Sequence, residues 1–105
     1  FYRNLPKLHK ICINTNVTAQ AINDCIATMG PAVASITDHN RMTPLHILAI
    51  NPHANSGALL ACFHANVCAI FLQDSRHKTP LDYLIEYHTI DEHTSLIAAL
   101  CVGII

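Results

Sequence analysis

Histidine and cysteine are the residues of this 105-residue chain that could do catalytic or metal chemistry, and it contains eight histidines and five cysteines. His88 and His93 are separated by four residues, a spacing at which two histidines can bind one zinc ion. A zinc site needs three or four ligands, and no C-x-x-C pair is present to complete this one. We therefore expect no bound metal and an ordinary loop around these two histidines.

A cysteine–histidine nucleophile would need a thiolate in an electropositive setting with a base beside it. Cys62 and His64 are two residues apart, so on a helix they would not face each other. Cys68 could approach His39 or His77 in the fold, although the sequence does not specify that contact. Neither a Gly-rich phosphate loop nor a G-x-S-x-G sequence occurs. The chain is therefore expected to be no enzyme and to hold no cofactor.

The composition favours a small folded chain that binds neither nucleic acid nor membrane. Apolar residues make up 51%, and the formal charge is −1 with six Lys and Arg. Nucleic-acid and polybasic membrane surfaces both need clustered positive charge, so Arg41 and Arg76 are expected to be solvated turn residues. The apolar C-terminal run is far shorter than the roughly 20 residues of a membrane span. We expect a partner or further repeats to cover it, and the chain to be a piece of a longer one.

The cysteines indicate the compartment. Their number is odd, and most of them lie among small apolar residues, where a free thiol behaves as a small buried hydrophobic group. This predicts an intracellular, reducing compartment, most simply the cytoplasm. The cysteines expected to be buried in this way are Cys12, Cys25, Cys62 and Cys101.

A sequence motif that occurs twice indicates the helices that position the histidine and cysteine side chains. Thr-Pro-Leu at 43–45 recurs at 79–81 after 36 residues, and an aspartate precedes each threonine by five residues. Proline suits the first turn of a helix and threonine suits the cap before it. Leu-His at 8–9 aligns with Leu-His at 45–46, which adds an earlier copy without Thr-Pro. We therefore predict a single array of three units: 4–37 (degenerate), 38–73 and 74–105.

Each unit is predicted to be a helical hairpin, from the spacing of its apolar residues. The expected first helices are 5–14, 44–51 and 80–88, and the expected second helices are 18–29, 57–66 and 92–102. Gly30-Pro31 is expected to end the second helix of the first unit. Between the units, 32–42 and 68–78 are expected to be extended loops with turns at 38–41 and 74–77.

These residues resemble the ankyrin repeat, whose pattern has an aspartate that opens a turn, a glycine three residues later, and Thr-Pro-Leu-His at the start of the inner helix. Asp38 followed by 43–46 matches strongly. The second copy, from Asp74, matches except that Asp82 replaces the histidine. The sequence of the repeats is similar to a divergent branch of the family that is found in large algal protein families. The resemblance is strong for 38–88 and weak for 1–37.

The resemblance implies an all-α fold, an ankyrin-like α-solenoid of helix-turn-helix repeats with extended finger loops. The sequence departs from the family pattern in two ways. Arg41 and His77 occupy the two glycine positions, and the period of 36 residues exceeds the usual 33. The family uses its repeated threonine and histidine to tie each unit to its neighbour. His9 and His46 fall at that histidine position and are therefore expected to be structural.

The function implied by the resemblance is protein binding, as a scaffold or assembly module. The family binds through its finger turns and the exposed, concave side of its inner helices. Tyrosine and arginine are frequent interface anchors, so Arg76 and Tyr87 carry the strongest expectation. The alternative is a structural spacer or subunit packed within a larger complex through its repeat ends. The residues expected to contact the partner protein are His39, Asn40, Met42, Ile50, Ser75, Arg76, Lys78, Glu86 and Tyr87.

Overall fold

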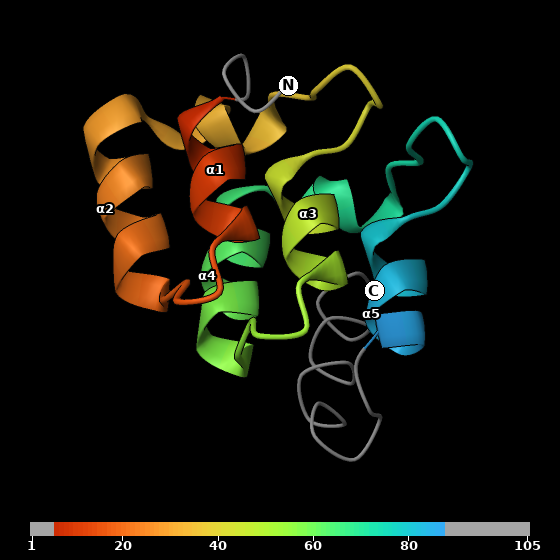
Figure 1. Ribbon diagram of the computed structural model, residues 1–105. Helices are drawn as coiled ribbons and strands as arrows, with labels where there is room; N and C mark the ends of the chain where they lie inside the picture. Colours follow the sequence, from red (N-terminus) through yellow and green to blue (C-terminus); the bar gives the residue numbers. More distant parts are fainter. Residues whose placement is uncertain (1–5, 88–105) are drawn as a thin grey trace.

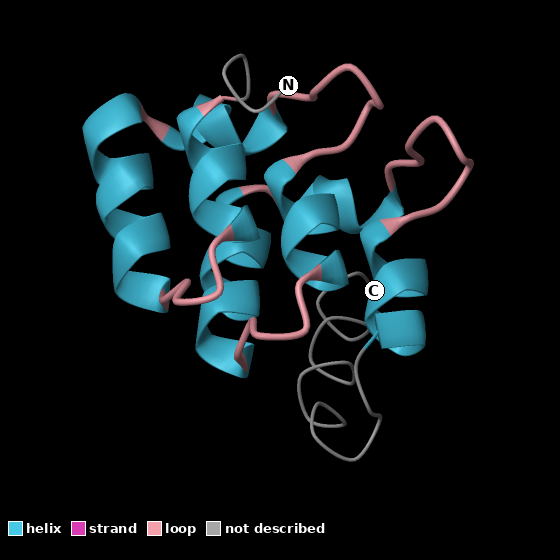
Figure 2. Cartoon of the chain, viewed as in Figure 1, coloured by secondary structure: helices cyan, strands magenta, loops and turns pink. Residues whose placement is uncertain are grey.

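A computed structural model describes residues 6–87, and every regular element in this range is a helix (Figure 2). Two α-helices are followed by a short 3-10 helix, and this order occurs twice before a last α-helix. The all-α prediction is thus confirmed for the described residues, whereas the predicted helix 92–102 lies outside them. The elements are α1 (Lys7–Ile13), α2 (Ala19–Met29), η2 (Pro31–Ser35), α3 (Pro44–Ile50), α4 (Ser56–Ala65), η3 (Val67–Phe71) and α5 (Pro80–Tyr87).

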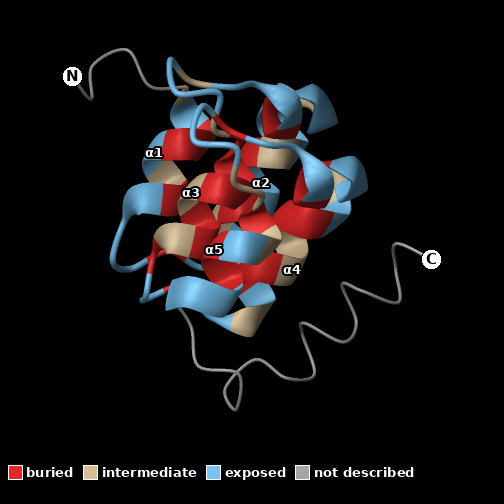
Figure 3. Ribbon diagram, turned by 90° about the vertical axis from the view of Figure 1, so that its right-hand side faces the viewer, coloured by how far each residue is buried: buried red, intermediate tan, exposed pale blue. Residues whose placement is uncertain are grey.

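The helices lie in two rows (Figure 1). Helix α3 packs between α1 and α5 in one row, and α2 packs against α4 in the other. Because α1 also contacts α2, and α3 contacts α4, the apolar faces of both rows meet in one core, which is visible as the buried band in Figure 3. The longest helix in 6–87 has 11 residues, too few to cross a membrane. The largest fully buried apolar side chains in the core are Leu8, Ile22, Leu45, Leu48, Leu59, Ile70 and Leu84.

Helix starts are fixed by side chains that accept hydrogen bonds from the first turn. The Thr43 side chain accepts from the backbone N–H of His46, and the His46 ring accepts from the backbone N–H of Thr43. Thr79 and Asp82 form the same reciprocal pair at the start of α5, at 3.2 and 2.9 Å. Both predicted threonine caps are therefore confirmed. Asp82 replaces histidine here without loss of the cap. Thr18 and Asn55 cap α2 and α4 in the simpler one-sided way.

The prediction of extended loops is wrong for 32–35 and 68–71, which belong to η2 and η3. Two consecutive residues are buried in each of them, Val33–Ala34 and Ala69–Ile70. An extended chain would send consecutive side chains to opposite faces, whereas a tight helical turn brings both toward the core. In η2, Pro31 also fixes a helical φ at the first position. The burial of paired apolar residues therefore selects the 3-10 turn.

The two fingers, residues 36–43 and 72–79, are held by aspartates. Asp38 Oδ1 accepts from the backbone N–H groups two and four residues later, at 2.8 and 3.0 Å. Asp74 Oδ1 repeats this pattern at 2.8 and 3.1 Å. A backbone hydrogen bond of 3.0 Å closes each turn, from residue 41 to 38 and from residue 77 to 74. The turns predicted at 38–41 and 74–77 are thus confirmed.

Each finger turn contains a non-glycine residue in the left-handed region. The φ angles of Arg41 and His77 are 61° and 63°, and these are the two positions that the ankyrin pattern fills with glycine. Glycine adopts such angles without steric cost because it has no Cβ atom, whereas any other residue pays a cost for its side chain. The turn therefore keeps its left-handed geometry, at the expense of local strain.

We expect Arg41→Gly and His77→Gly each to raise the free energy of unfolding by about 0.5–1 kcal/mol. A side chain in the left-handed region costs about 1–2 kcal/mol, and the extra chain entropy of glycine offsets roughly half of it. Urea unfolding followed by circular dichroism measures the change. His39→Gly is the control, because its φ is not positive. Equal stability of Arg41→Gly and His39→Gly would contradict the assignment of strain to residue 41.

Candidate functional site

His46 ties its helix to the second finger. Its Nε2 donates to the backbone carbonyl of Lys78 at 3.1 Å. Its Nδ1 accepts from the backbone N–H of Thr43 at 3.1 Å and faces the Thr43 hydroxyl at 2.8 Å. Nδ1 is therefore the acceptor and Nε2 carries the proton, which makes the ring neutral. Burial lowers the pKa of His46, against the opposing effects of the Lys78 carbonyl and the Asp74 charge.

His9 makes the same tie from α1 to the first finger. Its ring is fully buried, and Nε2 donates to the carbonyl of Met42 at 2.8 Å. Its Nδ1 has no hydrogen-bond partner within residues 6–87. Pro6 stands where Thr43 stands in the second copy, and proline has no N–H to donate. His9 is thus structural as well, but it is only half satisfied.

Two further hydrogen-bonded contacts join neighbouring segments. The Asn51 side-chain amide donates to the carbonyls of Cys12 and Asn14, both at 2.9 Å, and so links the end of α3 to the end of α1. The backbone N–H of Ser75 donates to the carbonyl of Asn40 at 2.9 Å and joins the two fingers directly. The fingers and the α1–α3–α5 row therefore form one continuous surface.

A groove of about 450 Å³ lies on this surface, between α1, α3 and the first finger. Three of the predicted contact residues, Asn40, Met42 and Ile50, line it. Ile13 and Ile47 also line it, and both were missed in the sequence. At the repeat offset of 37 residues Ile13 aligns with Ile50, and Ile47 lies one helical turn before Ile50 on α3. The repeat offset, read together with helical periodicity, was therefore the signal that could have found them.

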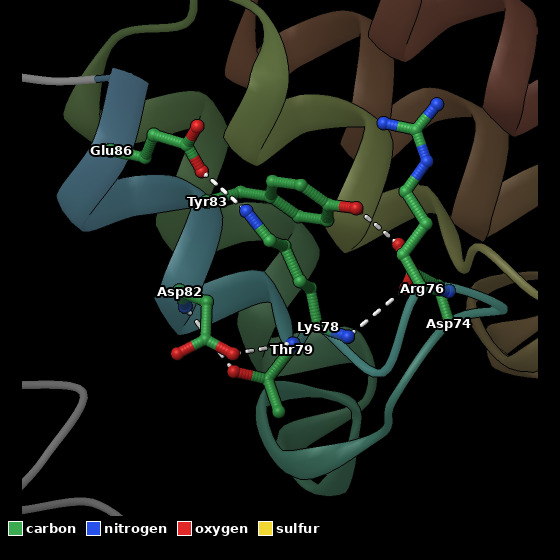
Figure 4. A network of polar contacts seen from close by, with 7 residues as sticks. All are labelled: Asp74, Arg76, Lys78, Thr79, Asp82, Tyr83 and Glu86. Atoms are coloured by element: carbon green, nitrogen blue, oxygen red, sulfur yellow. Dashed lines mark hydrogen bonds and ion pairs between the residues drawn. The ribbon is translucent and has the colours of Figure 1, made fainter.

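A second group of predicted residues meets on α5 (Figure 4). The Lys78 ammonium pairs with the Glu86 carboxylate at 2.9 Å and lies 5.6 Å from the centre of the Tyr83 ring. Tyr87 packs beside Tyr83 with ring centres 6.1 Å apart. Tyr83 was not predicted, yet it is the centre of this group. We call Lys78, Tyr83, Glu86 and Tyr87 the α5 cluster.

Tyr83 also anchors the second finger, because its hydroxyl donates to Asp74 Oδ2. Burial raises the pKa of Tyr83 to about 12, and the neighbouring Asp74 carboxylate adds to this. Burial would raise the pKa of Asp74 too, but hydrogen bonds from Tyr83 and from the backbone of Lys78 and Arg76 outweigh it, so its pKa is lowered. Tyr83 therefore stays protonated and Asp74 stays charged at neutral pH.

Comparison of this chain with family models, with curated proteins and with solved structures gave no match. The site is therefore described by its own geometry.

The remaining predicted residues lie on the fingers. His39, Ser75 and Arg76 are all exposed there. None of these three lines the groove, whereas Asn40 of the first finger does. The nine predicted residues therefore divide among the groove, the α5 cluster and the exposed finger turns.

Cysteines and histidines are spread over the described part of the chain. No three histidine, cysteine or acidic side chains gather there as metal ligands, and His88 and His93 lie outside the described residues. A contact with the Cys62 sulfur and burial raise the pKa of Cys12, which disfavours the reactive thiolate. The predicted burial of Cys12, Cys25 and Cys62 as free thiols is confirmed, Cys68 is free and exposed, and Cys101 lies outside the described residues.

Proposed function

We propose that this chain is a protein–protein interaction module, an ankyrin-like array that binds a partner through its fingers and the exposed side of α1, α3 and α5. One observation carries the proposal. The ties from His9 to Met42 and from His46 to Lys78 repeat the same contact between successive segments. Such repetition is what stacked units need, because one helical pair cannot bury its apolar face alone.

The same ties support binding rather than catalysis. The buried histidines and aspartate, which could act as acids or bases, are engaged in holding the fingers. What reaches the surface is a mixture of apolar, aromatic and charged side chains on a rigid support. Tyrosine and arginine on such a support are frequent anchors of protein interfaces. Tyr87 and Arg76, both exposed, fit this role.

Affinity capture with the double variant Arg76→Ala, Tyr87→Ala tests the proposal. We expect recovery of the bound partner to fall at least five-fold relative to the unaltered chain. The matched control is Gln20→Ala, Asp24→Ala, which changes two exposed residues of α2 in the other row. Thermal unfolding of each variant establishes that it is folded. Equal recovery with both double variants would exclude this surface as the binding site.

A structural spacer is the second candidate, and one observation favours it. Val67, Phe71 and Leu72 are exposed around η3 to 40%, 57% and 44%. Exposed apolar side chains in a group often mark a packing interface. If the chain is a packed subunit, Phe71→Ser with Leu72→Ser would abolish co-purification with its complex, while the Arg76 and Tyr87 variant would leave it intact.

A further inference from the structure

The floor of the groove is apolar and belongs to three different elements. Ile13 comes from α1, Met42 from the first finger, and Ile47 and Ile50 from α3. Ile13 is 37% exposed, and the other three are partly buried against the core. A volume of about 450 Å³ falls in the range of roughly 300–1,000 Å³ typical of ligand pockets. The groove is thus large enough to hold one or two aliphatic side chains.

Two of the polar side chains beside the floor are already committed within the fold. Asp38 Oδ1 accepts two backbone N–H groups of its own turn, and the Asn51 amide donates to two carbonyls of the α1 end. A small polar ligand would need directed hydrogen-bonding groups. Here the floor supplies mainly apolar contact area, so the groove suits an aliphatic side chain presented by a peptide.

The Asp38 carboxylate lines the groove and is negative, and two cations lie beside the groove. Lys10 lies three residues before Ile13 on the same face of α1, and Arg41 lies at the turn of the first finger. Both are exposed, and within residues 6–87 neither forms an ion pair. The Glu86 carboxylate on the α5 side is neutralised by Lys78 at 2.9 Å. An approaching chain therefore meets two unpaired cations and one carboxylate, whose Oδ1 is engaged in its own turn, so the charge beside the apolar floor is positive on balance.

We propose that this groove binds an extended segment of a partner protein that places an aliphatic side chain on Ile13, Ile47 and Ile50 and acidic residues toward Lys10 and Arg41. The inference rests on the proposed function and names the partner's chemistry. The apolar anchor supplies most of the affinity, because its contact area leaves water. The acidic residues supply orientation and a faster encounter, which added salt weakens.

Selection from a random library of displayed 12-residue peptides tests this. We expect enriched peptides to carry a leucine, isoleucine or methionine flanked by aspartate or glutamate. A fluorescein-labelled synthetic copy of an enriched peptide then serves as the probe in anisotropy titrations. Raising the salt from 50 to 200 mM is expected to weaken its binding at least three-fold.

Variants of the chain locate the probe. Ile13→Glu is expected to weaken binding at least ten-fold, and Lys10→Glu with Arg41→Glu at least five-fold. The second variant alters only exposed residues, so it remains informative if Ile13→Glu is poorly folded. The control is Met29→Glu, which adds the same charge at a half-exposed position of α2 and is expected to change the affinity less than two-fold. Arg76→Glu, which reverses a charge on the other finger, shows whether the peptide also reaches the second finger.

Three results would overturn the inference. Peptides that lose binding with Arg76→Glu but keep it with Ile13→Glu and with Lys10→Glu, Arg41→Glu would leave the proposed function standing and place the site at the second finger. Enrichment of basic peptides would reverse the assigned charge. Binding of a fluorescein-labelled single-stranded DNA oligomer, with no peptide enriched by the selection, would exclude both this inference and the proposed function.

Discussion

His46→Phe is expected to lower the free energy of unfolding by about 2–4 kcal/mol. The aromatic ring keeps the volume, but the backbone N–H of Thr43 and the carbonyl of Lys78 lose their partner in a buried setting. Each unsatisfied group costs about 1–3 kcal/mol. Urea unfolding monitored by circular dichroism measures the difference. His64→Phe, at an exposed position of α4, is the control and is expected to change stability by no more than about 0.5 kcal/mol.

The protonation of His46 is also expected to make the stability of the fold depend on pH. The folded pKa of His46 is lowered, chiefly by burial, so the unfolded chain binds more protons between the folded and unfolded pKa values. The contribution of His46 to the free energy of unfolding is complete above its unfolded pKa of about 6.5. It is lost as the pH falls from that value toward the folded pKa. Protonation would place a proton on Nδ1, where Thr43 already donates. His46→Phe should therefore flatten the pH dependence just below about 6.5. An unchanged slope would contradict the assigned tie.

Asp74→Ala is expected to cost about 3–4 kcal/mol, and Asp38→Ala about 1.5–2 kcal/mol, because hydrogen bonds to a charged group are worth about 1.5–3 kcal/mol each and are not fully additive. Both aspartates accept two N–H groups of their own turn. Asp74 is also buried and accepts from the Tyr83 hydroxyl. Chemical unfolding of the two variants side by side measures the difference.

Tyr83→Phe separates the two contributions of Asp74. It removes one donor and keeps the turn, so a loss of about 1–2 kcal/mol is expected. Because the folded pKa of Asp74 is lowered from 3.8, its contribution is present above about pH 4 and is lost as the pH falls through the folded value. If Asp74→Ala and Asp38→Ala lowered the free energy of unfolding equally, the hydrogen bond from Tyr83 to Asp74 would not contribute to stability.

The sequence predicted the features that depend on local chemistry. The starts of α3 and α5 follow from Thr-Pro and were correct. The turns at 38–41 and 74–77 were predicted correctly, but their left-handed geometry was not, because Arg41 and His77 stand where glycine is usual. Burial of three cysteines followed from their apolar neighbours. In each of these cases, the deciding interactions lie within a few residues along the chain.

Features that depend on distant contacts were missed. The groove needs Ile13 and Ile47 to lie beside the first finger, and neither residue is near the other in sequence. The Tyr83 contact with Asp74 spans a turn and the start of a helix. The 3-10 helices arise because paired apolar residues must reach the same core. The spacing of apolar residues within one segment does not contain these constraints.

The hydrogen bonds between segments also have consequences for how the protein opens. Asn51 reaches back to Cys12 and Asn14, while His46 reaches forward to Lys78. Helix α3 therefore cannot separate without releasing both neighbours, whereas α1 can detach while α3 and α5 stay together. Because α3 is hydrogen-bonded to segments on both sides, its amide protons would exchange with solvent only through complete unfolding. Those of α1 would exchange faster, through a partial opening at that end.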